Sequence, residues 1–299
     1  MFVNFTIIFD YILILLSELT DVLRSYNTRK INEFTLRKVG MGMLAIERRN
    51  RILSILQKEN RVVVADLSKE FNVTEETIRR DLEKLEKEGF AKKTYGGAII
   101  NESLNVDLPF TVRKKANVAN KQDIAELIDS LIQDGDHIML DASSTAVYIA
   151  KNLKNKKNLT LITNSIEILL ELSDVVGWKV LSTGGVMKEG SLSLVGHQAE
   201  KMINSFHVDK TIVSCKGLDI DYGITDSNEM EAHIKKLMLD CSATKILAVD
   251  NSKFDKISFT KIGDLSDIDI MVTDVEPDQK WKNIFNTLNI ENYFKTNES

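Results

Sequence analysis

The spacing of apolar residues changes once along this chain of 299 residues, near residue 101. Before that point apolar side chains recur at helical intervals; Ile78, Leu82 and Leu85, for example, fall on one side of a helix. After it, short runs rich in Ile, Val and Leu alternate with helical stretches, which is typical of an α/β domain. The two patterns in succession predict two domains, and the chain is long enough to give each one a core.

The first domain is predicted over residues 43–100. A helix should run from Met43 to about Asn60, and a second, short helix should cover residues 62–71. Asn72 suits a tight turn, and Thr74 should cap a third helix that ends at Gly89. The stretch "FAKKTYGGAII" alternates loosely and contains a Gly-Gly turn, which predicts a small hairpin. Helix, helix, turn, helix and hairpin together predict a winged helix-turn-helix.

The third helix places Arg80 opposite its apolar stripe. Glu75 and Arg79, and Glu76 and Arg80, are spaced four residues apart, which is also the pattern of a solvated helix without a ligand. The short helix and tight turn before it favour a helix that enters the major groove of DNA. The predicted DNA contacts on the helix and the hairpin are Thr74, Glu75, Thr77, Arg79, Arg80, Lys84, Lys92, Lys93 and Tyr95.

Residues 101–121 are polar, contain one of the two prolines and are predicted to form a linker. The second domain is expected over residues 122–299. Six apolar runs in it predict the strands of a largely parallel sheet, because helical patterns separate several of them. These runs lie at residues 137–141, 159–164, 179–184, 210–215, 245–250 and 268–274.

Polar residues follow many of these predicted strands. Open parallel sheets bind ligands at the carboxyl ends of their strands, so these loops are candidates for one site. In "LDASSTAVYIAKNL" three hydroxyls precede a helix and could hold an anion, although an ordinary helix cap would look the same. The predicted ligand contacts are Asp141, Ser143, Ser144, Thr145, Thr163, Asn164, Ser165, Gly184, Gly185, Lys216, Gly217, Asp250 and Lys253.

Charge and cysteine content narrow the remaining classes of function. The formal net charge is −5, so any nucleic-acid site must be a local patch. Two cysteines do not make a disulfide framework, and four scattered histidines give no metal-ligand spacing. We therefore expect a cytoplasmic protein with no metal, no cofactor and no membrane partner. Residues 1–42 begin with an apolar stretch interrupted by Asp10; we interpret them as an extension outside the fold, with a membrane-associated segment as the alternative.

The stretch "ERRNRILSILQKENRVVVADLSKEFNVTEETIRRDLEKLEKEGFAKKTYGGAI" resembles the DNA-binding domain of the DeoR family of bacterial transcriptional regulators. Its "TIRRDL" core and the later "GGA" carry the resemblance. The second domain is similar to the family's effector domain in "DASST", "TNS", "TGG" and "DNSKF". This resemblance implies an effector domain similar in fold to ribose-5-phosphate isomerase, and a repressor that a phosphorylated sugar releases from operator DNA.

The alternative is an isomerase-like enzyme for sugar phosphates with a fused DNA-binding module. It needs a general base near the bound sugar, for which Asp219, Asp226 and Glu231 are the candidates. No spacing among them indicates an acid–base pair, and Glu231 could simply pair with Lys235 four residues on. We predict a regulator without catalytic residues. A homo-oligomer is expected because helix-turn-helix proteins commonly read paired half-sites.

Overall fold

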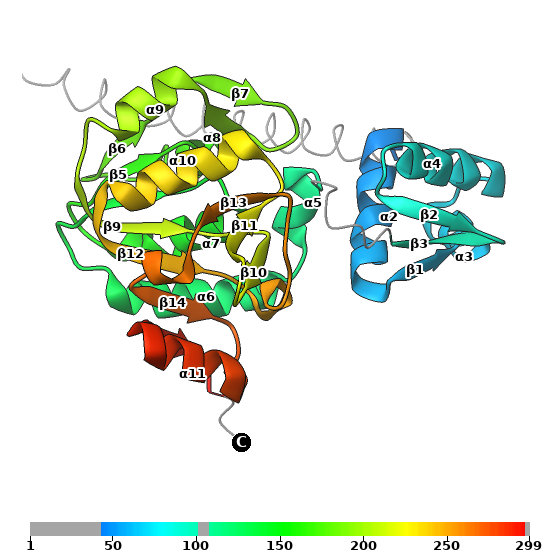
Figure 1. Cartoon of the computed structure of the whole chain (residues 1–299). Helices are drawn as coiled ribbons and strands as arrows, with labels where there is room; N and C mark the ends of the chain where they lie inside the picture. Colours follow the sequence, from blue (N-terminus) through cyan, green and yellow to red (C-terminus); the bar gives the residue numbers. More distant parts are fainter. Residues whose placement is uncertain (1–42, 101–107, 297–299) are drawn as a thin grey trace, which may run out of the picture.

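The computed structural model describes residues 43–100 and 108–296, with the predicted DNA-binding domain beside a larger α/β domain (Figure 1). The extension predicted for residues 1–42 lies outside the described residues. None of the described helices combines the length and the apolar character needed to cross a bilayer.

The first domain is the predicted winged helix-turn-helix. Its helices are α2 (Ala45–Glu59), α3 (Val64–Phe71) and α4 (Glu75–Lys87). Its sheet has the antiparallel order β1-β3-β2, with β1 (Arg61–Val63), β2 (Ala91–Thr94) and β3 (Gly97–Ile100). Ile78, Leu82 and Leu85 are buried in one core with residues of α2 and α3, as their spacing predicted.

The second predicted helix begins later than expected, because Val62 and Val63 belong to strand β1. Val62 pairs with Ala98 of the hairpin, so the β-branched residues add a third strand to the wing. A side chain at Gly97 would place its Cβ 2.0 Å from the Val62 carbonyl oxygen. Strands β1 and β3 can therefore approach each other only because residue 97 is glycine.

The turns follow the predicted chemistry. Asn72 has a φ of 51° at the end of α3, and Gly89 has a φ of 80° just after α4. Thr74 caps α4, where its hydroxyl oxygen accepts a hydrogen bond from the Thr77 N–H at 3.3 Å. Asn72 and Thr74 form the turn between α3 and α4, and Gly89 lets the chain leave α4 toward β2.

The segment predicted as a linker is helical from Phe110 onward. It contains α5 (Phe110–Lys115) and the start of α6 (Val118–Leu131). Phe110 is buried in the α/β domain, whereas Val112 is buried in the core of the DNA-binding domain. Helix α5 lies at the edge of the α/β domain that faces α2 (Figure 1). Two apolar anchors in a polar stretch are too few for a periodic signal, which is why the sequence pattern did not show this helix.

The second domain is built on a seven-stranded sheet in the order β15-β14-β12-β9-β4-β5-β6. Every neighbouring pair in it is parallel, which confirms the predicted sheet. The six predicted strands and one unpredicted strand, β15, are β4 (His137–Leu140), β5 (Thr160–Thr163), β6 (Lys179–Ser182), β9 (Val208–Val213), β12 (Ser242–Ala248), β14 (Ile270–Thr273) and β15 (Glu291–Phe294).

Helices cover both faces of this sheet. Ile138 and Leu140 pack into the core beneath α6 and α7, whereas Met139 packs into the core on the opposite face. The remaining helices are α7 (Ser144–Asn152), α8 (Ile166–Glu171), α9 (His197–Ile203), α10 (Glu229–Asp240) and α11 (Gln279–Leu288), with short 3-10 turns η1 (Leu153–Asn155), η2 (Asn251–Lys253) and η3 (Leu265–Asp267).

Two small antiparallel sheets complete the domain. One has the order β10-β11-β13, and the other is the hairpin β7-β8. Their strands are β10 (Gly217–Asp219), β11 (Gly223–Asp226), β13 (Thr260–Gly263), β7 (Val186–Lys188) and β8 (Ser193–Val195).

Candidate functional site

Helix α4 presents its two arginines to solvent. Arg79 pairs with Glu75 at 2.6 Å and Arg80 pairs with Glu76 at 3.2 Å, the spacing of four residues seen in the sequence. All four side chains are exposed, so these pairs contribute little to stability and can open when a phosphate or a base edge approaches. Thr77 is partly exposed on the same part of the helix.

The other predicted DNA contacts also lie on the surface of this domain. Lys84 is exposed on α4, and Lys92 and Lys93 are exposed on β2. Tyr95 is fully exposed at the tip of the hairpin, where Gly96 has a φ of 85°. A large aromatic side chain at a solvated turn adds no packing within the domain, so it is available to a partner.

Asp81, which the sequence did not single out, holds α4 against α2. Its carboxylate is buried and lies 2.5 Å from Arg48 Nε and 3.6 Å from Arg49 Nη1. Arg48 Nη1 also donates to the Met43 carbonyl oxygen. This buried ion pair fixes the helix that carries Arg79 and Arg80.

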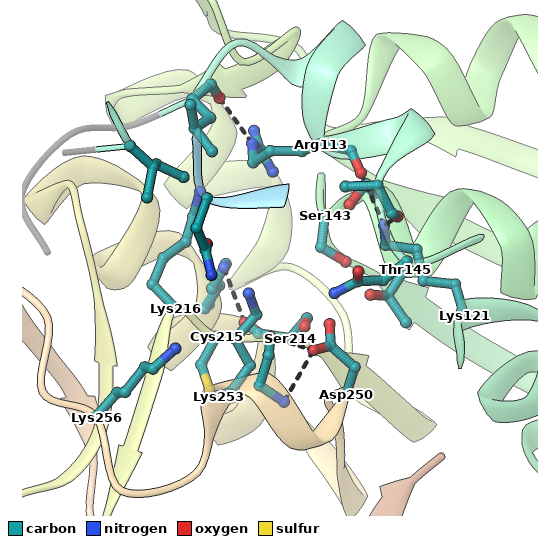
Figure 2. Close-up of a pocket in the computed structure, with 18 residues that line it drawn as sticks. Arg113, Lys121, Ser143, Thr145, Ser214, Cys215, Lys216, Asp250, Lys253 and Lys256 are labelled. Atoms are coloured by element: carbon teal, nitrogen blue, oxygen red, sulfur yellow. Dashed lines mark hydrogen bonds between the residues drawn. The ribbon is translucent and has the colours of Figure 1, made fainter. Parts of the chain in front are cut away.

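A cavity of about 660 Å³ opens between the two domains (Figure 2). Asn60 and Ile100 of the DNA-binding domain line it together with residues of the α/β domain. Its volume lies within the usual range of small-molecule sites, about 300–1,000 Å³. Six described lining residues are cationic, namely Arg113, Lys121, Lys216, Lys235, Lys253 and Lys256, whereas Asp250 is the one acidic residue among them.

Figure 2 shows the cations approaching this cavity from several elements. Arg113 and Lys121 come from α5 and α6, and Lys216 precedes β10. Lys253 ends η2, and Lys256 follows it. Positive charge gathered from such distant parts of the chain favours an anionic ligand.

Three hydroxyl residues at the start of α7 also line the cavity. Ser143 caps the helix, and its Oγ accepts a hydrogen bond from the Ala146 N–H at 3.0 Å. Ser144 and Thr145 follow in the first turn and are buried. The hydroxyls and the positive N-terminal end of the helix dipole therefore line the same cavity as the cations.

Asp250 and Lys253 are held at the end of strand β12. Asp250 caps η2 by accepting from the Ser252 N–H at 3.1 Å and from the Ser252 hydroxyl. Burial would raise the pKa of Asp250, but nearby Lys253, the Ser252 hydrogen bonds and Lys121 hold that pKa below its ordinary value. Asp250 therefore remains a carboxylate beside the lysines.

Asp141 and Asn164 line a smaller cavity, which shares four lining residues with the large one, namely Arg113, Ser143, Lys216 and Lys235. Asp141 accepts hydrogen bonds from the Ser143 N–H and the Ser214 N–H, at 3.1 and 3.0 Å. Asn164 donates to the Leu194 carbonyl oxygen, while its own Oδ1 is buried without a hydrogen-bond partner among the described residues.

Five other predicted contact residues line neither cavity. Thr163 donates to the Leu140 carbonyl oxygen at 2.7 Å, and Ser165 caps α8. A Cβ at Gly185 would lie 2.6 Å from the Val195 carbonyl oxygen, and one at Gly217 would lie 2.4 Å from the Lys256 carbonyl oxygen. Gly184 precedes this close approach with a φ of 63°. In the structure these residues shape the backbone around the site.

The run "EAHIK" supplies a buried charge network that the sequence did not predict. Lys235 Nζ lies 2.5 Å from Asp226 and 3.4 Å from Asp141. Burial would lower the pKa of Lys235, but the two carboxylates outweigh burial and raise it. Glu231 instead pairs with Lys188 at 3.3 Å and accepts from the Ser193 hydroxyl at 2.9 Å, so Glu231 and Lys235 take separate partners.

The candidate bases of an isomerase are engaged in structural contacts. Asp226 is tied to Lys235, and Glu231 to Lys188 and Ser193. Asp219 accepts from the backbone N–H groups of Asp221 and Tyr222 in a turn. These arrangements hold loops and helices together.

Lys121 and Arg113 are the cavity residues that the sequence analysis missed most clearly. Lys121 is buried; its Nζ donates to the Arg113 carbonyl oxygen at 2.7 Å and to the Ala116 carbonyl oxygen. Burial lowers the pKa of Lys121 to about 8, although Asp250 opposes that shift. The sequence did contain one sign of a basic site here, the run of Arg113, Lys114 and Lys115, but this run lay in the segment predicted as a linker.

Comparison with known proteins assigns both domains to one family. The family model described as a DeoR-like helix-turn-helix domain matches residues 48–104, and the DeoR C-terminal sensor domain matches residues 116–275. Among curated relatives, the "Uncharacterized HTH-type transcriptional regulator YulB" of Bacillus subtilis is 43% identical over 232 residues, which are 78% of this chain and 90% of that protein.

Two further relatives are named as a repressor and as an activator of transcription. The "Transcriptional repressor AccR" of Agrobacterium fabrum is 34% identical, with 76% of this chain and 89% of that protein covered. The "L-fucose operon activator" of Haemophilus influenzae is 33% identical, with 75% of this chain and 89% of that protein covered.

Among solved structures, ribose-5-phosphate isomerase A from Methanocaldococcus jannaschii is similar to part of the chain. It is 16% identical, covers 46% of this chain and 55% of its own, and has a TM-score of 0.35. A score this low supports no argument about activity. The two family models and the regulators above instead show that this chain is a DNA-binding transcriptional regulator that belongs to the DeoR family.

Proposed function

We propose that the chain is a cytoplasmic, homo-oligomeric repressor of sugar-metabolism genes that leaves its operator when a phosphorylated sugar binds in the cavity between the domains. One observation carries this proposal. The cavity is lined by six cations and one carboxylate among its described residues, and both domains contribute to its wall. A phosphate group carries close to two negative charges at neutral pH and therefore matches this lining.

The two ends of such a ligand would meet different residues. We assign the phosphate to Ser143, Ser144 and Thr145, with Lys253 and Lys216 supplying charge. Charge-assisted hydrogen bonds of this kind contribute about 1.5–3 kcal/mol each. Asp250, which stays ionised, would accept from sugar hydroxyls, as would the buried Oδ1 of Asn164 in the adjoining cavity.

The DNA-binding half of the proposal rests on exposed residues of α4 and the hairpin. Arg79 and Arg80 would leave Glu75 and Glu76 for base edges or phosphates, and Thr74, Thr77 and Lys84 would contact the same groove. Lys92, Lys93 and Tyr95 on the hairpin would reach the neighbouring backbone. The sensor function is supported by the match of residues 116–275 to a sensor domain.

The direct test uses the full chain, its operator fragment and a panel of pentose and hexose phosphates. Thermal unfolding reports binding, fluorescence anisotropy of labelled DNA reports release, and product analysis reports turnover. We expect at least one sugar phosphate to raise the unfolding temperature and weaken operator binding, with the parent sugar inactive and no product formed. Binding by none of the panel contradicts the proposal, and turnover would support the isomerase alternative.

A further inference from the structure

We propose that Lys121 reports an occupied cavity to the DNA-binding domain by releasing the end of helix α5. The inference rests on the proposed function, because it requires an anionic ligand in the cavity. It assigns to one buried side chain the step between ligand binding and loss of operator affinity.

The ammonium group of Lys121 closes the C-terminal end of α5. It donates to the Arg113 carbonyl oxygen at 2.7 Å and to the carbonyl oxygen of Ala116, the residue that caps α5. Carbonyl groups in the last turn of a helix lack partners within the helix, and a cation there stabilises the helix end. Lys121 thus fixes α5 from the neighbouring helix α6.

Helix α5 is anchored in both domains. Phe110 is buried in the core of the α/β domain, and Val112, two residues later, is buried in the core of the DNA-binding domain. The intervening Thr111 lies 3.5 Å from Asn50 of α2, measured from Oγ1 to Nδ2. Any displacement of α5 therefore moves one domain relative to the other, because close-packed cores transmit strain.

Lys121 also belongs to the cavity wall, and the charges of Asp250 and Lys253 act on its ammonium group. Lys121 lines the cavity together with Arg113, and the lining also includes Asn60 and Ile100 of the DNA-binding domain. A phosphate oxygen is a stronger hydrogen-bond acceptor for an ammonium group than a neutral carbonyl oxygen. Lys121 lines the same cavity as Ser143, Ser144 and Thr145, so in this proposal it joins Lys216 and Lys253 as a cation for the phosphate bound there. The phosphate then draws Lys121 Nζ away from the end of α5, and the last turn of α5 loses its cation.

This exchange supplies the two states that allostery requires. In one state Lys121 binds the carbonyl oxygens of α5, and in the other it binds the ligand. Because only the second state gains the ligand contact, the ligand favours it over the first. The change in α5 then alters the position of α2 and with it the presentation of α4 to DNA.

The first experiment compares the wild-type chain with Lys121→Met, and with Lys201→Met as a control that removes an exposed lysine on α9. Operator affinity is measured with and without saturating amounts of the sugar phosphate that shifts the unfolding temperature, chosen from a panel that includes ribose-5-phosphate and glucose-6-phosphate. Typical allosteric coupling weakens binding about 5–150-fold. We expect the sugar phosphate to weaken operator binding by the wild-type chain and by Lys201→Met by a factor in that range. For Lys121→Met we expect operator affinity to change by less than about threefold.

The outcomes separate the two claims. If Lys121→Met still gains thermal stability from the sugar phosphate and releases DNA by the wild-type factor, Lys121 is not the reporter and the inference fails alone. If no sugar phosphate binds the wild-type chain, the proposed function fails and the inference fails with it.

The second experiment needs no substitution and therefore does not depend on how a variant folds. Hydrogen exchange of the wild-type chain is followed over residues 110–116 with and without the same sugar phosphate. We expect faster exchange in α5 when the ligand is bound, because the last turn has lost the ammonium group. Unchanged or slower exchange in α5, with binding confirmed on the same sample, would overturn the inference.

Discussion

Phe110 and Val112 are two residues apart on α5, yet they are buried in the cores of different domains. This short helix joins the sensor to the DNA-binding domain, and Lys121 hydrogen-bonds its carboxyl end beside the cavity. Helix α5 thereby connects the proposed ligand cavity to the domain that carries α4.

The first prediction concerns the arginines of α4. Arg79→Ala or Arg80→Ala should weaken specific operator binding by about 1–3 kcal/mol if the residue reads a base edge. If it binds a phosphate, the affinity for all DNA sequences should fall by a similar factor. The slope of the logarithm of affinity against the logarithm of salt concentration should then become smaller by about one. Lys87→Ala is the matched control, because Lys87 pairs with Glu83 in the same way at the far end of α4. Unchanged operator affinity in the folded double variant would contradict the assignment.

The second prediction concerns the phosphate contacts. Ser144→Ala combined with Lys253→Ala should lower sugar-phosphate affinity by one or more orders of magnitude, since each lost charge-assisted bond contributes about 1.5–3 kcal/mol. Calorimetric titration measures this loss, with Lys201→Ala as a control outside the cavity. Operator affinity without sugar should stay near the wild-type value, and cells should show constant repression. Wild-type sugar affinity in the double variant would place the phosphate elsewhere.

Six strands of the large sheet and helix α4 were predictable from the sequence because their signals are local. Ile78, Leu82 and Leu85 repeat at helical spacing, and the apolar run at residues 137–141 is short enough to indicate a buried strand. The N-terminal cap at Thr74 and the turn at Asn72 likewise depend on a few neighbouring residues. These features were found as predicted.

The site was less predictable because its residues meet through tertiary contacts. Ser165 caps α8 just as Ser143 caps α7, and yet only Ser143 lines the large cavity. Thr163 likewise bonds the Leu140 carbonyl oxygen and does not line it. Nothing local distinguishes a hydroxyl that faces a cavity from one that closes a turn. Lys121 was not predicted as a site residue for a related reason. Its hydrogen-bond partners lie at the end of α5, a helix that has no periodic apolar pattern in the sequence.

A third prediction follows from the pKa of Lys121, which burial lowers from 10.5 to about 8. The charge of Asp250 opposes this shift, and the charges of Lys253 and Arg113 add to it. Below pH 8 the group is an ammonium that can bind a phosphate, and above pH 8 it becomes neutral. Sugar-phosphate affinity should therefore fall by up to about tenfold between pH 8 and 9. The ligand does not cause this fall, because a phosphate is already a dianion above its second pKa near 6.

The matched variant is Lys121→Arg, whose guanidinium stays charged throughout this range. Its sugar-phosphate affinity should change less between pH 8 and 9 than that of the wild-type chain. Calorimetric titrations at both pH values measure the difference. Parallel pH profiles for the two proteins would show that Lys121 does not titrate in contact with the ligand.

The fourth prediction concerns the ion pair that holds α4. Asp81→Ala leaves Arg48 buried without its carboxylate partner and should lower the free energy of unfolding of the DNA-binding domain by about 3–5 kcal/mol. Hydrogen exchange of the α4 amides reports this opening. Glu83→Ala, at an exposed site on the same helix, should leave the free energy of unfolding close to the wild-type value. Equal effects of the two substitutions would exclude a structural role for Asp81.

Ligand in the cavity and operator DNA on α4 should oppose each other, and a reciprocal titration measures this opposition. The sugar phosphate is titrated into the free full-length chain and into its operator complex, and operator affinity is measured with and without sugar. Thermodynamic linkage requires one coupling factor in both directions. We expect operator DNA to weaken sugar-phosphate binding by the same factor, about 5–150-fold, by which the sugar weakens operator binding. Equal sugar-phosphate affinity for the free chain and the operator complex would contradict this expectation.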